Sequence, residues 1–386
     1  MTLSIIIPTH NRADQLDRTL RALGALKGEI DHEVIVVDNN STDRTKGVAE
    51  SHDPVRYVFE PSTAFSKARR TGAENAVGSY LLFIDDDVLV APGSLDAIVR
   101  TFENDPTCAI VAAQILPEFL ETPPDWAIAC QRTFNGWSLY NSDMNPDLGA
   151  GVQNVEWAAG PMMAVRRDVF FDVHGFPADT VGVETNMGAR NFRKLYVGPG
   201  DSGLSYLVRQ KGFTVVYQPK AYCHHVIPPT RCTVSFWRSR MIGEAHQRAV
   251  SESVFYRLSR IARWEMTMKA SYRQMKWKRK FAQRLQLLEA FLIDSNFGGM
   301  LHEELWVQFY KSYFEIKAVL RRYPDLAGLL WKIGTEGVKN EEYDDVVGSL
   351  PVEFLDITDS ERYYNSCSIT TLEQYRRFLE GDKEKK

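Results

Sequence analysis

Four short apolar runs in the first quarter of the chain are each followed by a polar loop or a helical pattern. They are Leu3 to Ile7, Glu33 to Val37, Val55 to Phe59 and Tyr80 to Ile84. Short apolar runs bounded by loops are typical of buried strands. Strands that alternate with helices favour a parallel sheet covered by helices. The order therefore predicts an α/β fold with a Rossmann-like, mostly parallel sheet flanked by helices.

Three adjacent carboxylates, Asp85, Asp86 and Asp87, follow the last of these runs. Side chains alternate along an extended chain, so Asp85 and Asp87 are expected on one side and Asp86 on the other. Two neighbouring carboxylates suit a hard divalent cation. Ligands of open α/β sheets bind beyond the carboxyl ends of the strands, which is where this cluster lies. We therefore expect the functional edge of the sheet here.

The length of 386 residues exceeds what one ordinary core supports, so two domains are expected. Residues 1–228 form the predicted α/β domain, and a Pro-Pro pair at Pro228 marks the boundary. Beyond it, residues 229–386 show long helical patterns and few strand signals, which predicts a mainly helical C-terminal domain. Its last residues, Gly381 to Lys386, are expected to be a disordered tail.

The stretch from Pro117 to Asn154 has no sustained hydrophobic period. It contains several prolines and glycines, among them Pro123, Pro124 and Gly149. This composition predicts a long irregular excursion, and long loops of this kind are often functional.

The charge of the chain is uneven although its net value is only −4. That total gives no reason to expect nucleic acid as a partner. Residues 257–284, however, carry ten basic residues and one acid, Glu265, with aromatic residues and methionines between them. Two readings are open. The stretch is either an amphipathic helix on an anionic membrane surface or a solvated helix that packs on the first domain.

The cellular location follows from what the sequence lacks. Its five cysteines are scattered and form no close pair, which favours neither a disulfide framework nor a structural zinc site. We find no basic leader with an apolar core and no apolar run near the ~20 residues of a membrane span. We expect a cytoplasmic protein, with peripheral contact to the inner face of the cell membrane as an option. The oligomeric state is open.

Four motifs together resemble the family-2 glycosyltransferases of the A-type fold. They are SIIIPTHNR, VIVVDNNSTD, FSKARRTGAENAVGSYLLFIDDDV and GDSGLSYLVRQKG, in the family's order, within roughly residues 1–230. The resemblance implies inverting, hexosyltransferase-type transfer from a nucleotide sugar, with UDP-sugar favoured as donor. It also implies a divalent metal, Mg²⁺ or Mn²⁺, and a glycan, polysaccharide or lipid-linked acceptor.

The resemblance assigns roles to individual residues of this chain. The residues that match nucleotide-binding positions are Pro8, Thr9, Arg12, Asp38, Arg69, Asp85 and Asp86. Among these, Asp38 matches the acid that reads the base, and Asp85 approaches the ribose. The metal positions are Asp87 and His225. A loop near the donor sugar is matched by Gly160, Pro161 and Met162, and Trp157 either stacks on a sugar ring or packs in the core.

Asp201, in the motif GDSGL, matches the family's catalytic base. It would take the proton of the acceptor hydroxyl during direct displacement. An alternative is that its carboxylate caps the following helix. Gly200 and Gly203 stand where the family usually has further acids, so acceptor contacts are expected to differ here.

Two other functions are weighed against transfer. A sugar-nucleotide nucleotidyltransferase also binds Mg²⁺ through carboxylates, but it normally has a glycine-rich N-terminal phosphate loop, and Pro8 to Arg12 contains no glycine. A catalytically silent sugar-binding scaffold is favoured by Gly200 and Gly203. The presence of Asp85, Asp87 and Asp201 argues against it.

Overall fold

The computed structural model describes residues 2–26, 30–142, 148–178, 180–184, 192–196, 200–254, 297–336 and 349–350. The basic stretch at 257–284 and the tail from Gly381 lie outside these residues. The chain divides into two compact units. The first comprises residues 1–118, 138–227 and 331–347, and the second comprises residues 119–137, 228–330 and 348–386.

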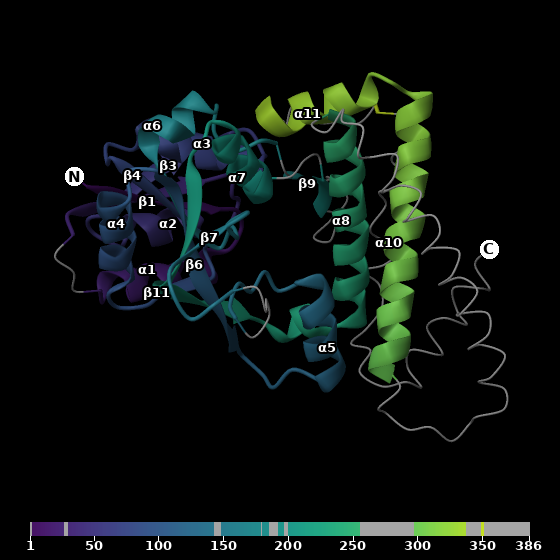
Figure 1. The fold of residues 1–386 in the computed structure, drawn as a ribbon, viewed down its shortest axis with the longest axis horizontal. Helices are drawn as coiled ribbons and strands as arrows, with labels where there is room; N and C mark the ends of the chain where they lie inside the picture. The colour runs from purple at the N-terminus through teal and green to yellow at the C-terminus, as the bar shows by residue number, and fades with distance from the viewer. Residues whose placement is uncertain are drawn as a thin grey trace. The chain divides into compact units, whose positions relative to one another are not determined.

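Strands and helices alternate along the first unit, and helices dominate the second (Figure 1). The strands are β1 (Leu3–Thr9), β2 (His32–Asp38), β3 (Arg56–Phe59), β4 (Tyr80–Ile84), β5 (Val88–Val90), β6 (Cys108–Phe119), β7 (Gln153–Val155), β8 (Met162–Arg166), β9 (Thr180–Glu184), β10 (Phe192–Tyr196) and β11 (Thr214–Ile227). The helices are α1 (Ala13–Gly24), α2 (Thr45–Glu50), α3 (Phe65–Asn75), α4 (Ser94–Asn104), α5 (Asp125–Phe134), α6 (Arg167–Asp172), α7 (Gly200–Gln210), η1 (Pro229–Cys232), α8 (Val234–Val254), α10 (Phe297–Arg322) and α11 (Leu326–Glu336).

One sheet organises the first unit, with the order β3-β2-β1-β4-β8-β6-β11-β5 and β7 paired with β11. Strands β3, β2, β1 and β4 are parallel neighbours. β8 is antiparallel to both β4 and β6, so β6 runs in the same direction as the first four. The predicted α/β class, with a mostly parallel, Rossmann-like sheet, is confirmed.

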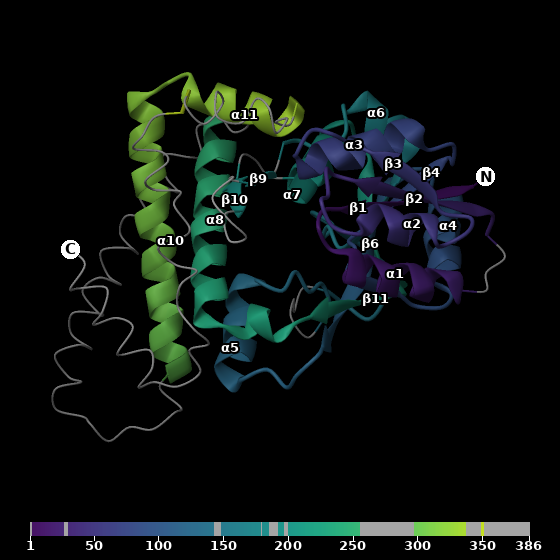
Figure 2. The ribbon, with the colours of Figure 1, turned by 180° about the vertical axis from the view of Figure 1, so that it is seen from behind.

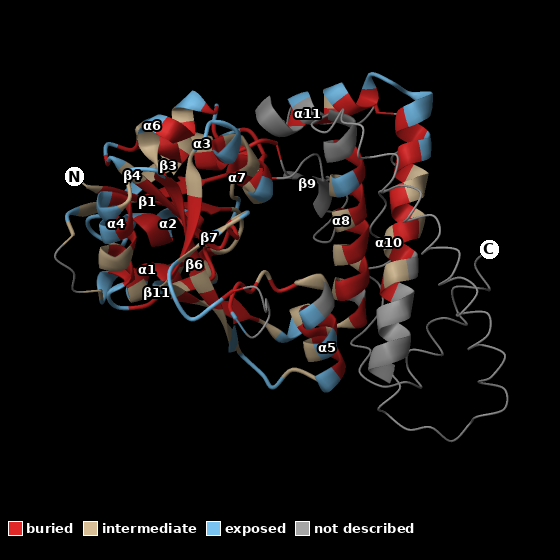
Figure 3. Cartoon of the chain, viewed as in Figure 1, coloured by how far each residue is buried: buried red, intermediate tan, exposed pale blue. Residues whose placement is uncertain are grey.

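The central strand explains why the chain adopts this sheet. Every residue of β1 is buried, as expected for a parallel strand that is covered by helices on both faces (Figure 3). Helix α1 places Leu16, Leu20 and Leu23 at helical spacing on one face, and all three are buried. Helix α3 approaches β1 so closely that a Cβ at Gly72 would overlap the side chain of Ile6. Glycine at this position therefore permits the packing.

Strand register brings several loops to one edge of the sheet. Thr9, the last residue of β1, lies beside Asp38, the last residue of β2. The antiparallel strand β8 begins where β4 ends, with Met162 opposite Ile84. The loop before β8 consequently enters at the carboxyl end of β4, where the backbone N–H of Asp85 donates to the Pro161 carbonyl at 3.1 Å.

Strand β11 is longer than the apolar run with which it begins. The apolar run ends at Tyr217, but the strand continues to Ile227. Its backbone pairs with β7 near one end and with β5 near the other, where His225 lies opposite Val88. Because this pairing uses backbone groups, the polar residues after Tyr217 do not end the strand.

The prediction of an irregular stretch from Pro117 to Asn154 was wrong in part, because α5 and β7 lie within it. Helix α5 has only ten residues, too few for a sustained period. Trp126, Ala127 and Cys130 are nevertheless buried along one side of it. Pro124 comes directly before the helix, where a proline costs no intrahelical hydrogen bond.

Long helices build the second unit, and the mainly helical C-terminal part is confirmed. Helices α8 and α10 lie side by side (Figure 2). Trp137 packs edge to face on Trp237 of α8, with ring centroids 5.4 Å apart, and Trp306 of α10 contacts Phe134 of α5 at 5.1 Å. None of the described helices combines the length and the apolar character that crossing a membrane requires.

Candidate active site

Asp85, Asp87 and His225 form a compact cluster at the carboxyl end of β4. The turn after β4 positions the two aspartates, and the pairing of β11 with β5 brings His225 to them. One potential ligand atom from each residue lies within 4.8 Å of the other two. Asp87 and His225 are buried, with side chains 2% and 3% exposed, and Asp87 Oδ1 lies 3.2 Å from His225 Nε2. Two carboxylates and an imidazole are a donor set that fits a divalent cation such as Mn²⁺.

Asp86 makes different contacts from its two neighbours. The Thr9 hydroxyl donates to its Oδ2 at 2.7 Å, and the Arg12 guanidinium lies 2.8 Å from its Oδ1. Arg12 also reaches Asp87 Oδ2 at 2.6 Å, so it bridges the two carboxylates. Thr9 and Arg12 thus hold Asp86 away from the cation-binding cluster.

Burial and neighbouring charges shift the ionisation of this cluster. Burial raises the pKa of Asp86 to about 7, Arg12 opposes the shift, and the charge of Asp87 adds to it. Burial likewise raises the pKa of Asp85. Although burial by itself lowers the pKa of Arg12, the charges of Asp86 and Asp87 raise it above its ordinary value. An added cation would favour the ionised carboxylates.

Arg69 links this cluster to Asp201. It projects from α3, is 2% exposed, and places Nη1 2.5 Å from Asp201 Oδ1 and Nη2 3.7 Å from Asp85 Oδ1. The rings of Phe65 and Phe176 lie 3.9 and 4.5 Å from its guanidinium carbon. Two aromatic rings and an ion pair together fix the orientation of this guanidinium group.

The ionised groups at this edge leave a surplus of negative charge. Four carboxylates, on Asp85, Asp86, Asp87 and Asp201, face the two guanidinium groups of Arg12 and Arg69. With all of them ionised, the surplus is two negative charges. A divalent cation balances that surplus, which supports the fit of the donor set.

Asp201 lies in the first turn of α7 and is 31% exposed, so it is open to a small molecule. The Ser205 hydroxyl accepts a hydrogen bond from the backbone N–H of Ala158 and donates one to the Asp201 carbonyl. These bonds tie α7 to the loop before β8. A Cβ at Gly160 in that loop would overlap the Asp201 carboxylate, so a larger residue there would force the carboxylate to move.

Asp38 is held from two sides at the end of β2. The backbone N–H of Ser41 donates to its Oδ1 at 2.8 Å, and the Tyr57 hydroxyl donates to its Oδ2 at 2.8 Å. Burial, together with the hydrogen bond to Asp38, raises the pKa of Tyr57. The carboxylate of Asp38 is therefore fixed at the edge where Thr9 also ends.

The remaining predicted residues lie in or near the core. Pro8 is buried in β1, and Met162 is fully buried as the first residue of β8. Trp157 is half-buried, with its ring edge to face on Tyr140 at 5.0 Å, and its carbonyl accepts the Tyr140 hydroxyl. Core packing accounts for these contacts of Trp157.

Three aromatic residues that the sequence patterns did not predict support the site: Tyr57, Phe65 and Phe176. Phe65 precedes Arg69 by four residues on a helix, so helical spacing could have predicted their contact. Tyr57 and Phe176 come from other segments, and no local pattern relates them to Asp38 or Arg69.

Comparison with known proteins identifies part of this chain. Residues 4–170 match the model of glycosyl transferase family 2. The chain is 23% identical over 267 residues to a glucosyl-dolichyl phosphate glucuronosyltransferase of Haloferax volcanii, covering 66% of this chain and 79% of that protein. It is 38% identical over 103 residues to a validoxylamine A glucosyltransferase of Streptomyces hygroscopicus, covering 25% of this chain and 24% of that protein.

A solved structure with a similar chain course is mannosyltransferase PcManGT from Pyrobaculum calidifontis, in complex with GDP-Man and Mn²⁺. It is 18% identical, with a TM-score of 0.45, and the match covers 98% of this chain and 86% of that one. The family match and the two relatives found by sequence, together with the α/β sheet and its acidic carboxyl edge, support a transferase of the glycosyltransferase class. The similarity to glycosyl transferase family 2 lies in residues 4–170.

Proposed function

We propose that this protein transfers a hexose, with inversion, from a nucleoside diphosphate sugar to a hydroxyl group of a glycan or lipid-linked acceptor. The observation that carries the proposal is the position of Arg69, which contacts both Asp201 and Asp85. A candidate base and a candidate cation site thus share one edge of the sheet. Direct displacement requires both a group that activates the acceptor and a site for the departing diphosphate.

Asp201 is the proposed general base. Its carboxylate takes the proton of the acceptor hydroxyl while the acceptor oxygen bonds to the anomeric carbon of the sugar. The bond from that carbon to the diphosphate oxygen breaks, and its electron pair leaves with the nucleoside diphosphate. Since the acceptor attacks opposite the leaving group, the anomeric configuration inverts. Arg69 and Gly160 hold the carboxylate in place for this step.

Asp87, His225 and Asp85 would hold the divalent cation, Mn²⁺ or Mg²⁺. A bound cation neutralises the negative charge that develops on the departing diphosphate. Arg12 orients Asp87 through its second carboxylate oxygen and leaves Oδ1 facing His225. We assign the nucleotide to the neighbouring edge at Thr9 and Asp38, with uridine as the favoured base.

Product analysis tests this proposal against the two other functions. The purified protein is incubated with UDP-, GDP- and dTDP-sugars, candidate hydroxyl acceptors and Mn²⁺. Release of nucleoside diphosphate supports transfer, whereas formation of pyrophosphate from nucleotide and sugar phosphate would identify a nucleotidyltransferase. Donor binding without turnover would identify a scaffold. Asp87→Asn should abolish metal-dependent release, whereas Asp172→Asn, at an exposed position on α6, should not.

We further propose a lipid-linked acceptor at the inner face of the cell membrane. The name of the Haloferax relative specifies a dolichyl phosphate-linked sugar. The basic stretch at 257–284 would complement anionic headgroups. Liposome flotation tests this: the protein should float with anionic vesicles and not with neutral ones, and equal behaviour with both would exclude the membrane contact.

A further inference from the structure

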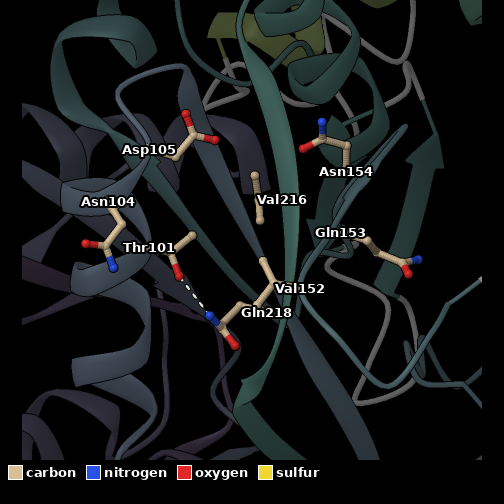
Figure 4. Close-up of a pocket in the computed structure, with 8 residues that line it drawn as sticks. All are labelled: Thr101, Asn104, Asp105, Val152, Gln153, Asn154, Val216 and Gln218. Atoms are coloured by element: carbon tan, nitrogen blue, oxygen red, sulfur yellow. Dashed lines mark hydrogen bonds between the residues drawn. The ribbon is translucent and has the colours of Figure 1, made fainter.

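A groove of about 380 Å³ lies on the first unit (Figure 4). Val216 and Gln218 of β11 form its floor. One wall is the end of α4, with Asn104 and Asp105, and the other is the segment that leads into β7, with Asn154. Its volume falls within the ~300–1,000 Å³ of small-molecule sites.

The groove is separate from the candidate active site. Gln218 and His225 are seven residues apart on the same strand, and a strand rises ~3.3 Å per residue, so they lie roughly 23 Å apart along β11. Asp105 lies three residues before Cys108, the first residue of β6, at the amino edge of the sheet. Asp85 and Asp201 lie at the carboxyl edge. A ligand in the groove therefore does not reach the reacting groups.

The floor and one wall are held by internal hydrogen bonds. Gln218 Nε2 donates to the Thr101 hydroxyl at 2.9 Å, as drawn in Figure 4, and its Oε1 accepts the backbone N–H of Lys220. Asp105 Oδ1 accepts both the N–H and the hydroxyl of Thr107, and these bonds lower the pKa of Asp105. The groove thus has a fixed shape and an ionised hydrogen-bond acceptor.

The exposed lining indicates the chemistry of the ligand. Asn104 and Asn154 are exposed and lie on opposite sides of the groove (Figure 4). Each amide offers two donor hydrogens and an acceptor oxygen, which suits hydroxyl groups. No lysine or arginine lines the groove, so an anion has no counter-charge there. Val152, 59% exposed, adds apolar surface for the C–H face of a sugar ring.

We propose that this groove binds neutral sugar units of an extended glycan at a distance from the reaction centre. The glycan is the acceptor or product of the transfer proposed above, and to that extent the inference rests on the proposed function. Holding a distant part of the chain raises the effective concentration of its reacting end. Binding to the groove itself needs neither donor nor cation.

Oligosaccharide binding to the full chain, measured by titration calorimetry in EDTA without nucleotide, tests the proposal. The probes are neutral hexasaccharides of α-glucan, β-glucan and mannan, with sulfated counterparts. The wild type should bind at least one neutral probe and bind its sulfated form more weakly. Loss of one hydrogen bond typically lowers binding affinity severalfold. The double variant Asn104→Ala, Asn154→Ala should therefore bind the probe about tenfold more weakly than the wild type.

The control is Glu103→Ala, an exposed position on the same helix outside the groove, which should bind like the wild type. Val152→Asp serves as an independent variant, because it replaces apolar surface with a charge, and it should also weaken binding. Absence of binding to all neutral probes, or equal binding by the double variant and the wild type, would overturn the proposal. The titration does not measure glycosyl transfer. A negative binding result therefore does not test the proposed transferase activity, which the nucleotide-release assay tests separately.

Discussion

The Asp201 carboxylate is confined by residues from three separate segments. Arg69 of α3 pairs with one oxygen, Gly160 leaves space for the other, and the backbone of Asp201 is tied through Ser205 to the loop before β8. A base must lie within hydrogen-bond reach of the proton it removes, so its position matters as much as its basicity. Two substitutions separate these contributions.

Asp201→Asn should preserve donor binding and remove most transfer. The amide keeps nearly the same shape but cannot accept the acceptor proton, and general-base catalysis typically contributes 10²–10⁴-fold. The measurements are kcat for transfer and Kd for the nucleotide. Asp172→Asn, at an exposed position of α6, is the matched control. Wild-type turnover in Asp201→Asn would refute its assignment as the base.

Gly160→Ala should lower kcat while the fold survives. The added methyl would overlap the Asp201 carboxylate and displace it, and a misplacement of about 1 Å can cost ~10²-fold in rate. Gly151→Ala is a control in the same segment, because a Cβ there meets no atom within 4 Å. Circular dichroism and kcat are measured for both variants. Equal kcat values in the two would show that Asp201 needs no such space.

At the scale of elements, helix α8 carries a buried histidine far along the chain from the acidic edge. His246 is 3% exposed, and burial lowers its pKa to about 3. An unfolded histidine has a pKa near 6.5. Between these values the unfolded chain binds a proton that the folded chain does not. The resulting stabilisation is fully present above about pH 6.5 and is lost as the pH falls.

Acidification should therefore destabilise α8 through His246 by about 2 kcal/mol between pH 6.5 and pH 5. Urea unfolding, followed by tryptophan fluorescence at several pH values, measures this loss. In His246→Leu the corresponding part of the pH dependence should disappear. Other groups titrate in both proteins, so the difference between the two curves isolates His246. Parallel curves would show that His246 is not buried as a neutral group.

At the scale of the whole molecule, the candidate site joins residues from β1, β2, β4, α3, α7 and β11. Elements so far apart in the chain meet only in the folded first unit. A ligand that binds this arrangement consequently stabilises the folded state over the unfolded state. We also propose that the chain divides at residue 228 into an α/β domain and a mainly helical C-terminal domain.

UDP with Mn²⁺ should raise the unfolding temperature more than UDP with EDTA. At a ligand concentration 100 times Kd, the linkage contributes about 2.7 kcal/mol to the free energy of unfolding. Scanning calorimetry with UDP, GDP and dTDP would also show which nucleotide base gives the largest rise in unfolding temperature. In Asp87→Asn the effect of the metal should be lost. Equal stabilisation with and without Mn²⁺ would argue against a cation at Asp85, Asp87 and His225.

Local sequence determined much of the architecture. Short apolar runs predicted β1 and β4, because residue type and period set where buried strands form. The three carboxylates after β4 predicted a divalent-cation site at the carboxyl edge of the sheet. The motif GDSGL, through its resemblance to family-2 glycosyltransferases, marked Asp201 as a candidate base. The helix α5 and the length of β11 were not predicted. A ten-residue helix shows too little period, and backbone pairing leaves no trace in side-chain polarity.

Only the tertiary structure decided which of these groups meet. Asp87 and His225 are far apart in the chain, and the pairing of β11 with β5 places them 3.2 Å apart. Arg69 joins Asp201 because α3 and α7 reach the same edge of the sheet. Burial then sets their charges, as in the raised pKa of Asp86. Contact between distant segments depends on strand order and register, which residue type and local spacing do not specify.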